Sequence, residues 1–209
     1  MTFGLEPEAV QTAVEQGTIV LDGRSPEDFD AGHVPGAVNV PLAGSGFAER
    51  MRSAIRTGAP AIVVAGSDGE SLAMAWAIER DGRGPVLGTL AGGVEAYAAA
   101  GFELGRLSSV SAAQVAGDLA LGGAVMIDAR EDDDWVRGHV PGSLHIPLRS
   151  VASAAGLLPS VPVVVACTDG SRAATAASIL RRLGHANVWR VAGPGVPELL
   201  RRRLNLGGI

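Results

Sequence analysis

The chain has 209 residues, of which 47% are hydrophobic and 19% charged, so it can bury one large or two small globular cores. Its net charge of -5 gives no general attraction to nucleic acid or to an anionic membrane, and no basic patch is interleaved with aromatic residues. The N-terminal segment MTFGLEPEAV has no basic stretch followed by an apolar one, and no apolar run approaches membrane-spanning length. We therefore expect a cytoplasmic protein that binds neither nucleic acid nor membranes.

One segment occurs twice in the chain. VLDGRSPEDFDAGHVPGAVNVPL at Val20–Leu42 matches MIDAREDDDWVRGHVPGSLHIPL at Met126–Leu148 without a gap. Each copy occupies roughly a hundred residues, which is a common domain size. The repeat predicts two domains, residues 1–105 and 106–209.

Helical and strand patterns alternate within each copy, which predicts an α/β fold with a mostly parallel central sheet flanked by helices. In the second copy, Ser111 is the expected N-cap of a helix that runs to Leu121, and Gln114 is its capping-box partner. The later strands are expected at residues 124–128, 143–146, 161–166 and 187–191. The later helical segments are expected at residues 131–138, 151–158, 173–183 and 197–203.

The single cysteine, Cys167, follows a buried strand and precedes a predicted helix, in the sequence CTDGSR. Ligands bind at such corners of parallel sheets because the first helical turn leaves backbone N–H groups without partners. Gly170 permits a turn that directs several N–H groups to one point, and such a position lowers the pKa of a thiol. A lone cysteine here is otherwise a small core residue. The surrounding residues favour a nucleophile, or a thiol-bound anion, in a cradle of amides.

Three motifs in this order, Asp-x-Arg, Gly-His-Val-Pro-Gly and Cys-x-x-Gly-x-Arg, resemble those of the rhodanese (sulfurtransferase) family. The resemblance covers nearly the whole chain, twice. It implies that Cys167 is catalytic and carries sulfur as a persulfide. It also implies thiosulfate or a low-molecular-weight persulfide as donor, cyanide or a thiol as acceptor, and no metal or organic cofactor. The substrate-binding ring of N–H groups and side chains would then be Thr168, Asp169, Gly170, Ser171 and Arg172.

Two other functions remain as alternatives. Dual-specificity phosphatases of the cell-division type have a similar fold with five residues between Cys and Arg, whereas four residues separate Cys167 from Arg172. This shorter loop favours sulfur over phosphate. The second alternative is a non-catalytic persulfide or redox sensor, or a protein-interaction module.

The first copy departs from the family pattern at the cysteine. Its sequence AGSDGE places Gly66 opposite Cys167 and Ser71 opposite Arg172, so it cannot form a persulfide. Resemblance to two-domain sulfurtransferases implies an inactive N-terminal copy that packs against the active one. Residues that recur in the copy without the nucleophile are expected to be structural. These residues are Asp22, Arg24, His33, Asp128, Arg130 and His139.

Acidic residues bear on the choice of sulfur donor. The segment EDDDW at residues 131–135 and Asp169 are acidic, and the nearby cations are Arg130, Arg137 and Arg172. Carboxylates at the mouth repel the thiosulfate dianion within about 10 Å at physiological salt, which favours a persulfide donor. The arrangement also resembles the tandem rhodanese portion that accompanies metallo-β-lactamase-type persulfide dioxygenases, which implies a partner of that type.

Overall fold

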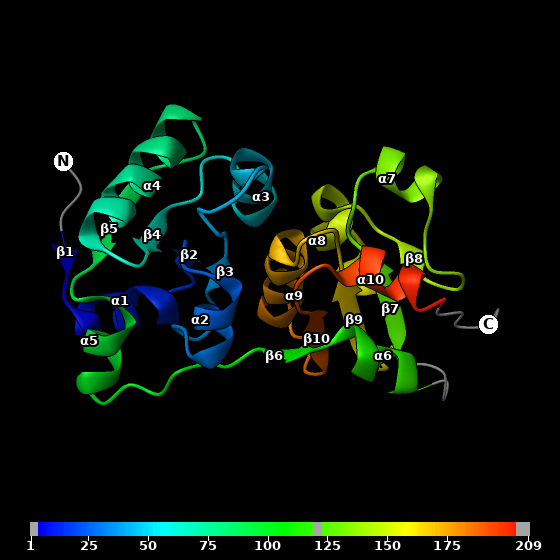
Figure 1. The fold of residues 1–209 in the computed structure, drawn as a ribbon. Coiled ribbons are helices and arrows are strands. Elements are labelled where there is room, and N and C mark those ends of the chain that lie inside the picture. The colour runs from blue at the N-terminus through cyan, green and yellow to red at the C-terminus, as the bar shows by residue number, and fades with distance from the viewer. Residues whose placement is uncertain (1–3, 119–122, 204–209) are drawn as a thin grey trace. The chain divides into compact units, whose positions relative to one another are not determined.

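The structure is a computed structural model that describes residues 4–118 and 123–203 (Figure 1). The chain divides into two compact units, Met1–Arg106 and Leu107–Ile209. Each unit contains a sheet of five strands, the paired strands run parallel, and helices cover both faces. This confirms the predicted α/β fold class. No helix among the described residues has the length and apolar character that crossing a bilayer requires.

The first unit has the strand order β1-β5-β4-β2-β3. Its strands are β1 (Gly4–Leu5), β2 (Ile19–Asp22), β3 (Val38–Asn39), β4 (Ala61–Val64) and β5 (Val86–Leu90). Its helices are α1 (Pro7–Glu15), α2 (Pro26–Ala31), α3 (Phe47–Ala54), α4 (Asp68–Arg80) and α5 (Gly93–Ala99). Figure 1 shows α4 on one face of this sheet and α1 and α5 on the other.

The second unit repeats that order as β6-β10-β9-β7-β8. Its strands are β6 (Ser108–Val110), β7 (Val125–Asp128), β8 (Leu144–His145), β9 (Val163–Ala166) and β10 (Val188–Val191). Its helices are α6 (Ala112–Asp118), α7 (Asp132–Arg137), α8 (Val151–Ala154), α9 (Ser171–Arg182) and α10 (Gly195–Arg201), with 3-10 turns η2 (Leu148–Ser150) and η3 (Ala155–Leu157). Helices α8 and α9 pack together on one face, and α6 and α10 pack together on the other (Figure 1).

Continuously apolar strands form the centre of each sheet. All four residues of β4 and all four of β9 are buried, as expected for parallel strands covered on both faces. In the second unit, Val164 and Val191 pack with Val196 and Leu199 of α10 in one apolar cluster. The strand order places β9 in the middle of the sheet, and the short loop after its carboxyl end leads into α9.

Several predicted boundaries need correction. The capping box at α6 is confirmed, because the Gln114 N–H donates to Ser111 Oγ at 3.2 Å and the Ser111 N–H donates to Gln114 Oε1 at 2.8 Å. The predicted extension of that helix to Leu121 lies outside the described residues. Strand β6 was not predicted, because its three residues lie in a stretch without clear hydrophobic periodicity. These residues form a strand by pairing with β10. The predicted helix at 151–158 is a short helix between 3-10 turns.

The strand register also corrects the internal alignment. Asp22 pairs with Val64 in the first unit, and its counterpart Asp128 pairs with Ala166 in the second. The residue that follows each paired residue is therefore equivalent, so Ala65, and not Gly66, occupies the place of Cys167. The sequence alignment placed Gly66 opposite Cys167 because the loop after β4 is one residue shorter than the loop after β9. Neither Ala65 nor Gly66 has a thiol, so the first unit still lacks the cysteine.

Candidate active site

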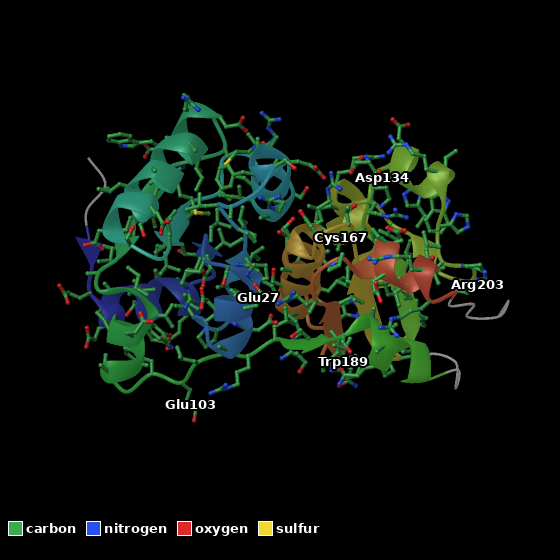
Figure 2. The ribbon with its side chains drawn as sticks, viewed as in Figure 1. Glu27, Glu103, Asp134, Cys167, Trp189 and Arg203 are labelled. Carbon is green, nitrogen blue, oxygen red and sulfur yellow. The ribbon has the colours of Figure 1, made fainter. Side chains whose placement is uncertain are left out.

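Cys167 lies directly after β9, the middle strand of the second sheet, and immediately before the turn into α9 (Figure 2). Its side chain is buried. Its backbone is fixed from the neighbouring helix, because the Val196 N–H at the start of α10 donates to the Cys167 carbonyl at 2.9 Å. The chain thus presents the sulfur at the corner where parallel sheets bind ligands.

Backbone N–H groups converge on the Cys167 sulfur. The Gly170 N–H donates to Sγ at 3.1 Å and the Ala173 N–H donates to Sγ at 3.3 Å. Gly170 has φ of 91°, a left-handed conformation that favours glycine and turns its amide towards the sulfur. Of these two donors, Gly170 belongs to the predicted ring and Ala173 lies one residue beyond it, because α9 begins at Ser171 rather than at Ala173.

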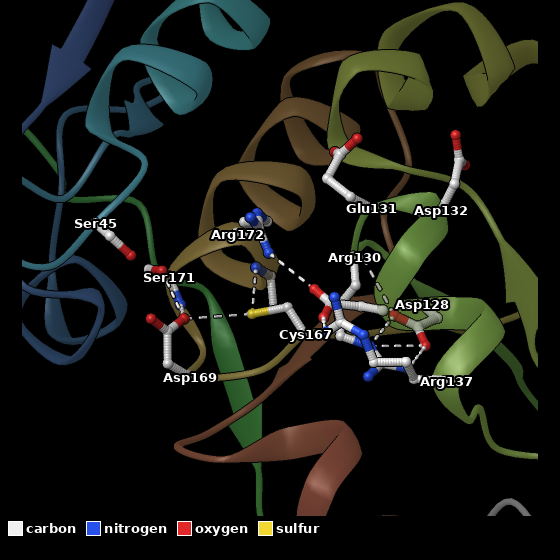
Figure 3. Close-up of polar contacts among 12 residues, drawn as sticks. Ser45, Asp128, Arg130, Glu131, Asp132, Arg137, Cys167, Asp169, Ser171 and Arg172 are labelled. Atoms are coloured by element: carbon white, nitrogen blue, oxygen red, sulfur yellow. Dashed lines mark hydrogen bonds and ion pairs between the residues drawn. The ribbon is translucent and has the colours of Figure 1, made fainter.

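Asp169 lies beside the sulfur. The Cys167 thiol donates to Asp169 Oδ1 across 3.7 Å, and the same oxygen accepts from the Ser171 N–H at 3.0 Å and from the Ser171 hydroxyl at 2.6 Å. The Ser171 N–H therefore satisfies Asp169 and not the sulfur. This carboxylate both orders the turn into α9 and places negative charge next to the thiol (Figure 3).

The pKa of the Cys167 thiol is raised, contrary to the expectation from its position at a helix start. Burial is the main cause, because it disfavours the thiolate, and the Asp169 charge adds to it. Hydrogen bonds from the backbone N–H groups of Ala173, Asp169 and Gly170 lower the pKa but do not outweigh burial. Burial thus favours the protonated thiol, while the Gly170 and Ala173 N–H groups are already in place to donate to an anion.

The other predicted ring residues lie at the edge of the loop. Thr168 is exposed, and Arg172 is half-buried. Arg172 Nη1 lies 3.9 Å from Asp134 Oδ2 on α7, and Arg137 Nη1 lies 3.1 Å from Asp134 Oδ1 (Figure 3). The predicted basic and acidic groups near the mouth are thus largely paired with one another.

Two other acidic residues of the segment at 131–135 also form ion pairs with an arginine. Arg149 forms ion pairs with Glu131 and Asp132, both at the start of α7. Opposite charges at these distances reduce the field that a dianion would meet. Of the predicted acidic groups, Asp169 is the one that lies against the sulfur itself.

The Asp–Arg pairs shared by both units make the same contacts in each, as a structural role requires. Arg130 Nη2 lies 2.6 Å from Asp128 Oδ2 and donates to the Gly138 carbonyl at 2.8 Å. Arg24 makes the equivalent bonds to Asp22 at 2.6 Å and to Gly32 at 2.7 Å.

The shared histidines make similar side-chain contacts, although His33 is buried and His139 is exposed. His139 stacks on Trp135 with ring centroids 3.7 Å apart, and His33 stacks on Phe29 at 3.8 Å. In each unit, the histidine Nδ1 also contacts the carbonyl of that aromatic residue. Because the unit without the cysteine has this arrangement as well, the arrangement itself is independent of the thiol.

The corresponding corner of the first unit is filled by its own side chains. The Ala65 N–H donates to the Ser71 hydroxyl at 3.0 Å. A Cβ added at Gly66 would lie 2.8 Å from Glu70 Oε2, so the Glu70 carboxylate lies against this loop. A hydroxyl and a carboxylate therefore occupy the corner that holds a thiol in the second unit.

Sequence reasoning missed one residue near the loop, Arg190. It lies on β10, it is 1% exposed, and a Cβ added at Gly170 would lie 3.5 Å from its Nη1. The sequence signal for Arg190 was a charged residue inside the strand sequence VWRV at Val188–Val191, in a sheet whose other central strands are mainly apolar. A charged residue in such a strand needs a specific reason to be there.

Comparison with known proteins matches both units to one family. The model of the rhodanese-like domain matches residues 6–100 and 111–194. The thiosulfate sulfurtransferase GlpE of Pseudomonas fluorescens is 34% identical over 74 residues, which are 34% of this chain and 66% of that protein. GlpE of Ectopseudomonas mendocina is 31% identical over 83 residues, which are 38% of this chain and 74% of that protein. The chain thus spans just under two thirds of the length of the Pseudomonas fluorescens relative.

Solved structures with a similar fold cover most of the chain at low identity. SseA from Escherichia coli, described among 3-mercaptopyruvate sulfotransferases, has a TM-score of 0.43 and 17% identity, with 92% of this chain and 98% of that chain covered. A thiosulfate sulfurtransferase from Pseudomonas aeruginosa has a TM-score of 0.39 and 20% identity, with 96% of this chain and 43% of that chain covered.

Proposed function

Because this chain belongs to the rhodanese-like domain family in both of its units, we propose that it is a sulfurtransferase in which Cys167 carries the sulfur atom. The relatives named as thiosulfate sulfurtransferases support this class of reaction. The observation that carries the proposal is the convergence of the Gly170 and Ala173 N–H groups on the only cysteine sulfur of the chain. The first unit, which has no cysteine, is proposed to be inactive.

The proposed reaction has two displacements. The Cys167 thiol, which contacts Asp169 Oδ1 before the reaction, first loses its proton to a base in solution. The thiolate then attacks the outer sulfur of the donor, a sulfur–sulfur bond forms to Cys167, and the donor's own sulfur–sulfur bond breaks to release sulfite or a thiolate. The product is a Cys167 persulfide anion, and the loop N–H groups stabilise its charge. Cyanide or a thiolate attacks the terminal sulfur in the second step and restores the Cys167 thiolate.

Among donors, we propose a low-molecular-weight persulfide rather than thiosulfate. The Asp169 carboxylate lies 3.7 Å from Sγ, so it repels an approaching dianion more than a singly charged persulfide. The acceptor is proposed to be a thiol or cyanide. A persulfide dioxygenase-type protein is proposed as the partner that consumes the transferred sulfur.

Steady-state kinetics test the function. Initial rates should be measured with glutathione persulfide or thiosulfate as donor and with cyanide or dithiothreitol as acceptor, each varied at several concentrations of the other. A double displacement gives parallel lines in a double-reciprocal plot, and Cys167→Ser should have no activity above the uncatalysed rate. Activity in Cys167→Ser would overturn the proposal.

A second candidate, a persulfide or redox sensor, is favoured by the burial of Cys167 and by the raised pKa of its thiol, since both slow a nucleophile. A sensor would accept one sulfur per chain and would not turn over with any acceptor. The same kinetic experiment therefore separates the two functions.

A further inference from the structure

A buried arginine lies against the loop that carries Cys167. Arg190 on β10 pairs with Val165 on β9, two residues before Cys167, and its side chain is 1% exposed. Gly170 lies between the Arg190 guanidinium and the Cys167 sulfur. A Cβ added at Gly170 would lie 3.5 Å from Arg190 Nη1, and the Gly170 N–H donates to the Cys167 sulfur at 3.1 Å. The guanidinium thus lies against a residue that supplies one of the hydrogen bonds to the sulfur.

The charge of Arg190 is permanent, since a guanidinium does not lose its proton in proteins. The Cys167 corner is a place where the proposed reaction creates negative charge, first on the thiolate and then on the persulfide.

Other charged groups surround this corner, and most of them form pairs. Asp128 pairs with Arg130 after β7, and Asp134 on α7 lies near Arg172. Glu198 on α10 pairs with Arg201 and Arg202. Asp169 adds negative charge beside the sulfur. Arg190 adds a buried positive charge next to Gly170.

The first unit provides an internal comparison. Thr89 on β5 pairs with Val63 on β4, as Arg190 pairs with Val165 on β9, so Thr89 is the equivalent of Arg190. The unit with the cysteine has an arginine at this position, and the unit without the cysteine has a threonine. The cation therefore accompanies the thiol and is not required by the fold.

We propose that Arg190 is a positioning residue that holds the Gly170 amide on the sulfur and stabilises negative charge on Cys167. The effect applies to the thiolate that forms when Cys167 loses its proton in the absence of any donor. Its extension to the persulfide anion rests on the proposed sulfurtransferase function. In both states, the positive charge acts through the loop and Arg190 does not touch the reacting atoms.

The pH dependence of Cys167 alkylation tests this proposal without any sulfur donor. Cys167 is the only cysteine, so the rate of its reaction with iodoacetamide follows the thiolate of that residue alone. Arg190→Gln should shift the midpoint to higher pH and lower the rate below the midpoint about tenfold, because a nearby opposite charge favours ionisation. Arg190→Lys retains the charge and should stay within about threefold of wild type.

Arg50→Gln is the matched control, because Arg50 is also 1% exposed but lies in the first unit, where it donates to the Pro41 and Ala43 carbonyls. It should leave the alkylation profile unchanged. A folded Arg190→Gln variant with the wild-type midpoint would overturn the proposal.

A second measurement on the wild-type protein does not depend on any variant folding. The Arg190 side-chain Nε–H resonance should shift with pH at the same midpoint as the alkylation rate, and the Arg50 resonance should not. An Arg190 resonance that does not respond to thiol ionisation would overturn the proposal. Neither readout uses a sulfur donor, so a protein that never forms a persulfide would refute the proposed function and leave this result intact.

Discussion

The Cys167 thiol donates to Asp169 Oδ1 across 3.7 Å, and this carboxylate also accepts from the N–H and the hydroxyl of Ser171. One side chain thus orders the start of α9 and stabilises the protonated form of the candidate nucleophile. The contact opposes the two backbone N–H groups that favour the thiolate. The balance between the Asp169 carboxylate and the two N–H groups sets how much of Cys167 is thiolate, and so how fast it reacts.

Asp169→Asn is predicted to lower the pKa of Cys167, because it removes a negative charge beside the thiol and keeps an oxygen for Ser171. Alkylation of Cys167 near neutral pH should become about three- to tenfold faster. The kcat/KM for thiosulfate should rise more than that for glutathione persulfide. Asp132→Asn, which alters an exposed acid paired with Arg149, is the control and should change neither. An unchanged alkylation profile in Asp169→Asn would contradict the assignment.

Gly170→Ala is predicted to weaken both stability and sulfur transfer. The residue has φ of 91°, and the new Cβ would lie 3.3 Å from Gly193 N and 3.5 Å from Arg190 Nη1. We expect a loss of about 1–3 kcal/mol in the free energy of unfolding and a drop in transfer rate of at least about tenfold, since the amide on the sulfur must move.

Gly184→Ala is the matched control for backbone strain alone. Gly184 has φ of 97° with nothing within 4 Å of a new Cβ. The Gly184→Ala variant should lose about 1 kcal/mol in the free energy of unfolding and keep the wild-type rate of sulfur transfer. Equal rates in the two variants would show that the Gly170 amide is not part of the cradle.

His33 is predicted to reduce the stability of the first unit in acid. Burial lowers the pKa of His33, although its bond to the Phe29 carbonyl opposes this effect. The unfolded chain therefore binds a proton at a higher pH than the folded unit does. Stability should be complete above the unfolded pKa of about 6.5 and should fall as the pH drops through it towards the folded value.

His33→Gln should flatten this acid-side slope, measured by urea unfolding between pH 4 and pH 8, a range of about two units either side of the unfolded pKa. His139→Gln changes the equivalent histidine, which is exposed, and serves as the comparison. If His33→Gln retained the wild-type slope, burial of His33 would not be the source of the pH dependence.

Asp22→Asn is predicted to destabilise the first unit without affecting the chemistry of Cys167. Asp22 is fully buried and accepts a bidentate pair of hydrogen bonds from Arg24. Breaking such a pair costs about 3–5 kcal/mol, because one charge is left without its partner. Unfolding should shift to lower urea, and the amount of sulfur bound per folded chain should stay at the wild-type level. Loss of sulfur binding in a folded Asp22→Asn protein would instead assign this pair a functional role.

The fold class and the place of Cys167 could be predicted from the sequence because their signals are local. Apolar runs such as Val163–Ala166 and the repeated Gly-His-Val-Pro-Gly segment specify buried strands and a duplicated unit. The Ser111 and Gln114 capping box was equally local. Strand β6 had no such signal, since its residues become a strand only by pairing with β10.

The details of the site depended on contacts between distant segments. The pKa of Cys167 was expected to fall because of its position at a helix start, but burial raises it. The arginine at position 190 lies far along the chain from Cys167, and only the pairing of β10 with β9 brings it to the loop. The equivalence of Ala65 with Cys167 required the strand register, because the two loops differ in length.

Intact-mass spectrometry after incubation with a sulfur donor tests the central claim most directly. Wild-type protein treated with glutathione persulfide or thiosulfate, and freed of excess donor, should gain the mass of one sulfur atom and lose it on addition of dithiothreitol. Cys167→Ser should gain nothing under the same conditions. An equal gain in Cys167→Ser, or no gain in the wild-type protein with either donor, would contradict the claim that Cys167 carries the transferred sulfur.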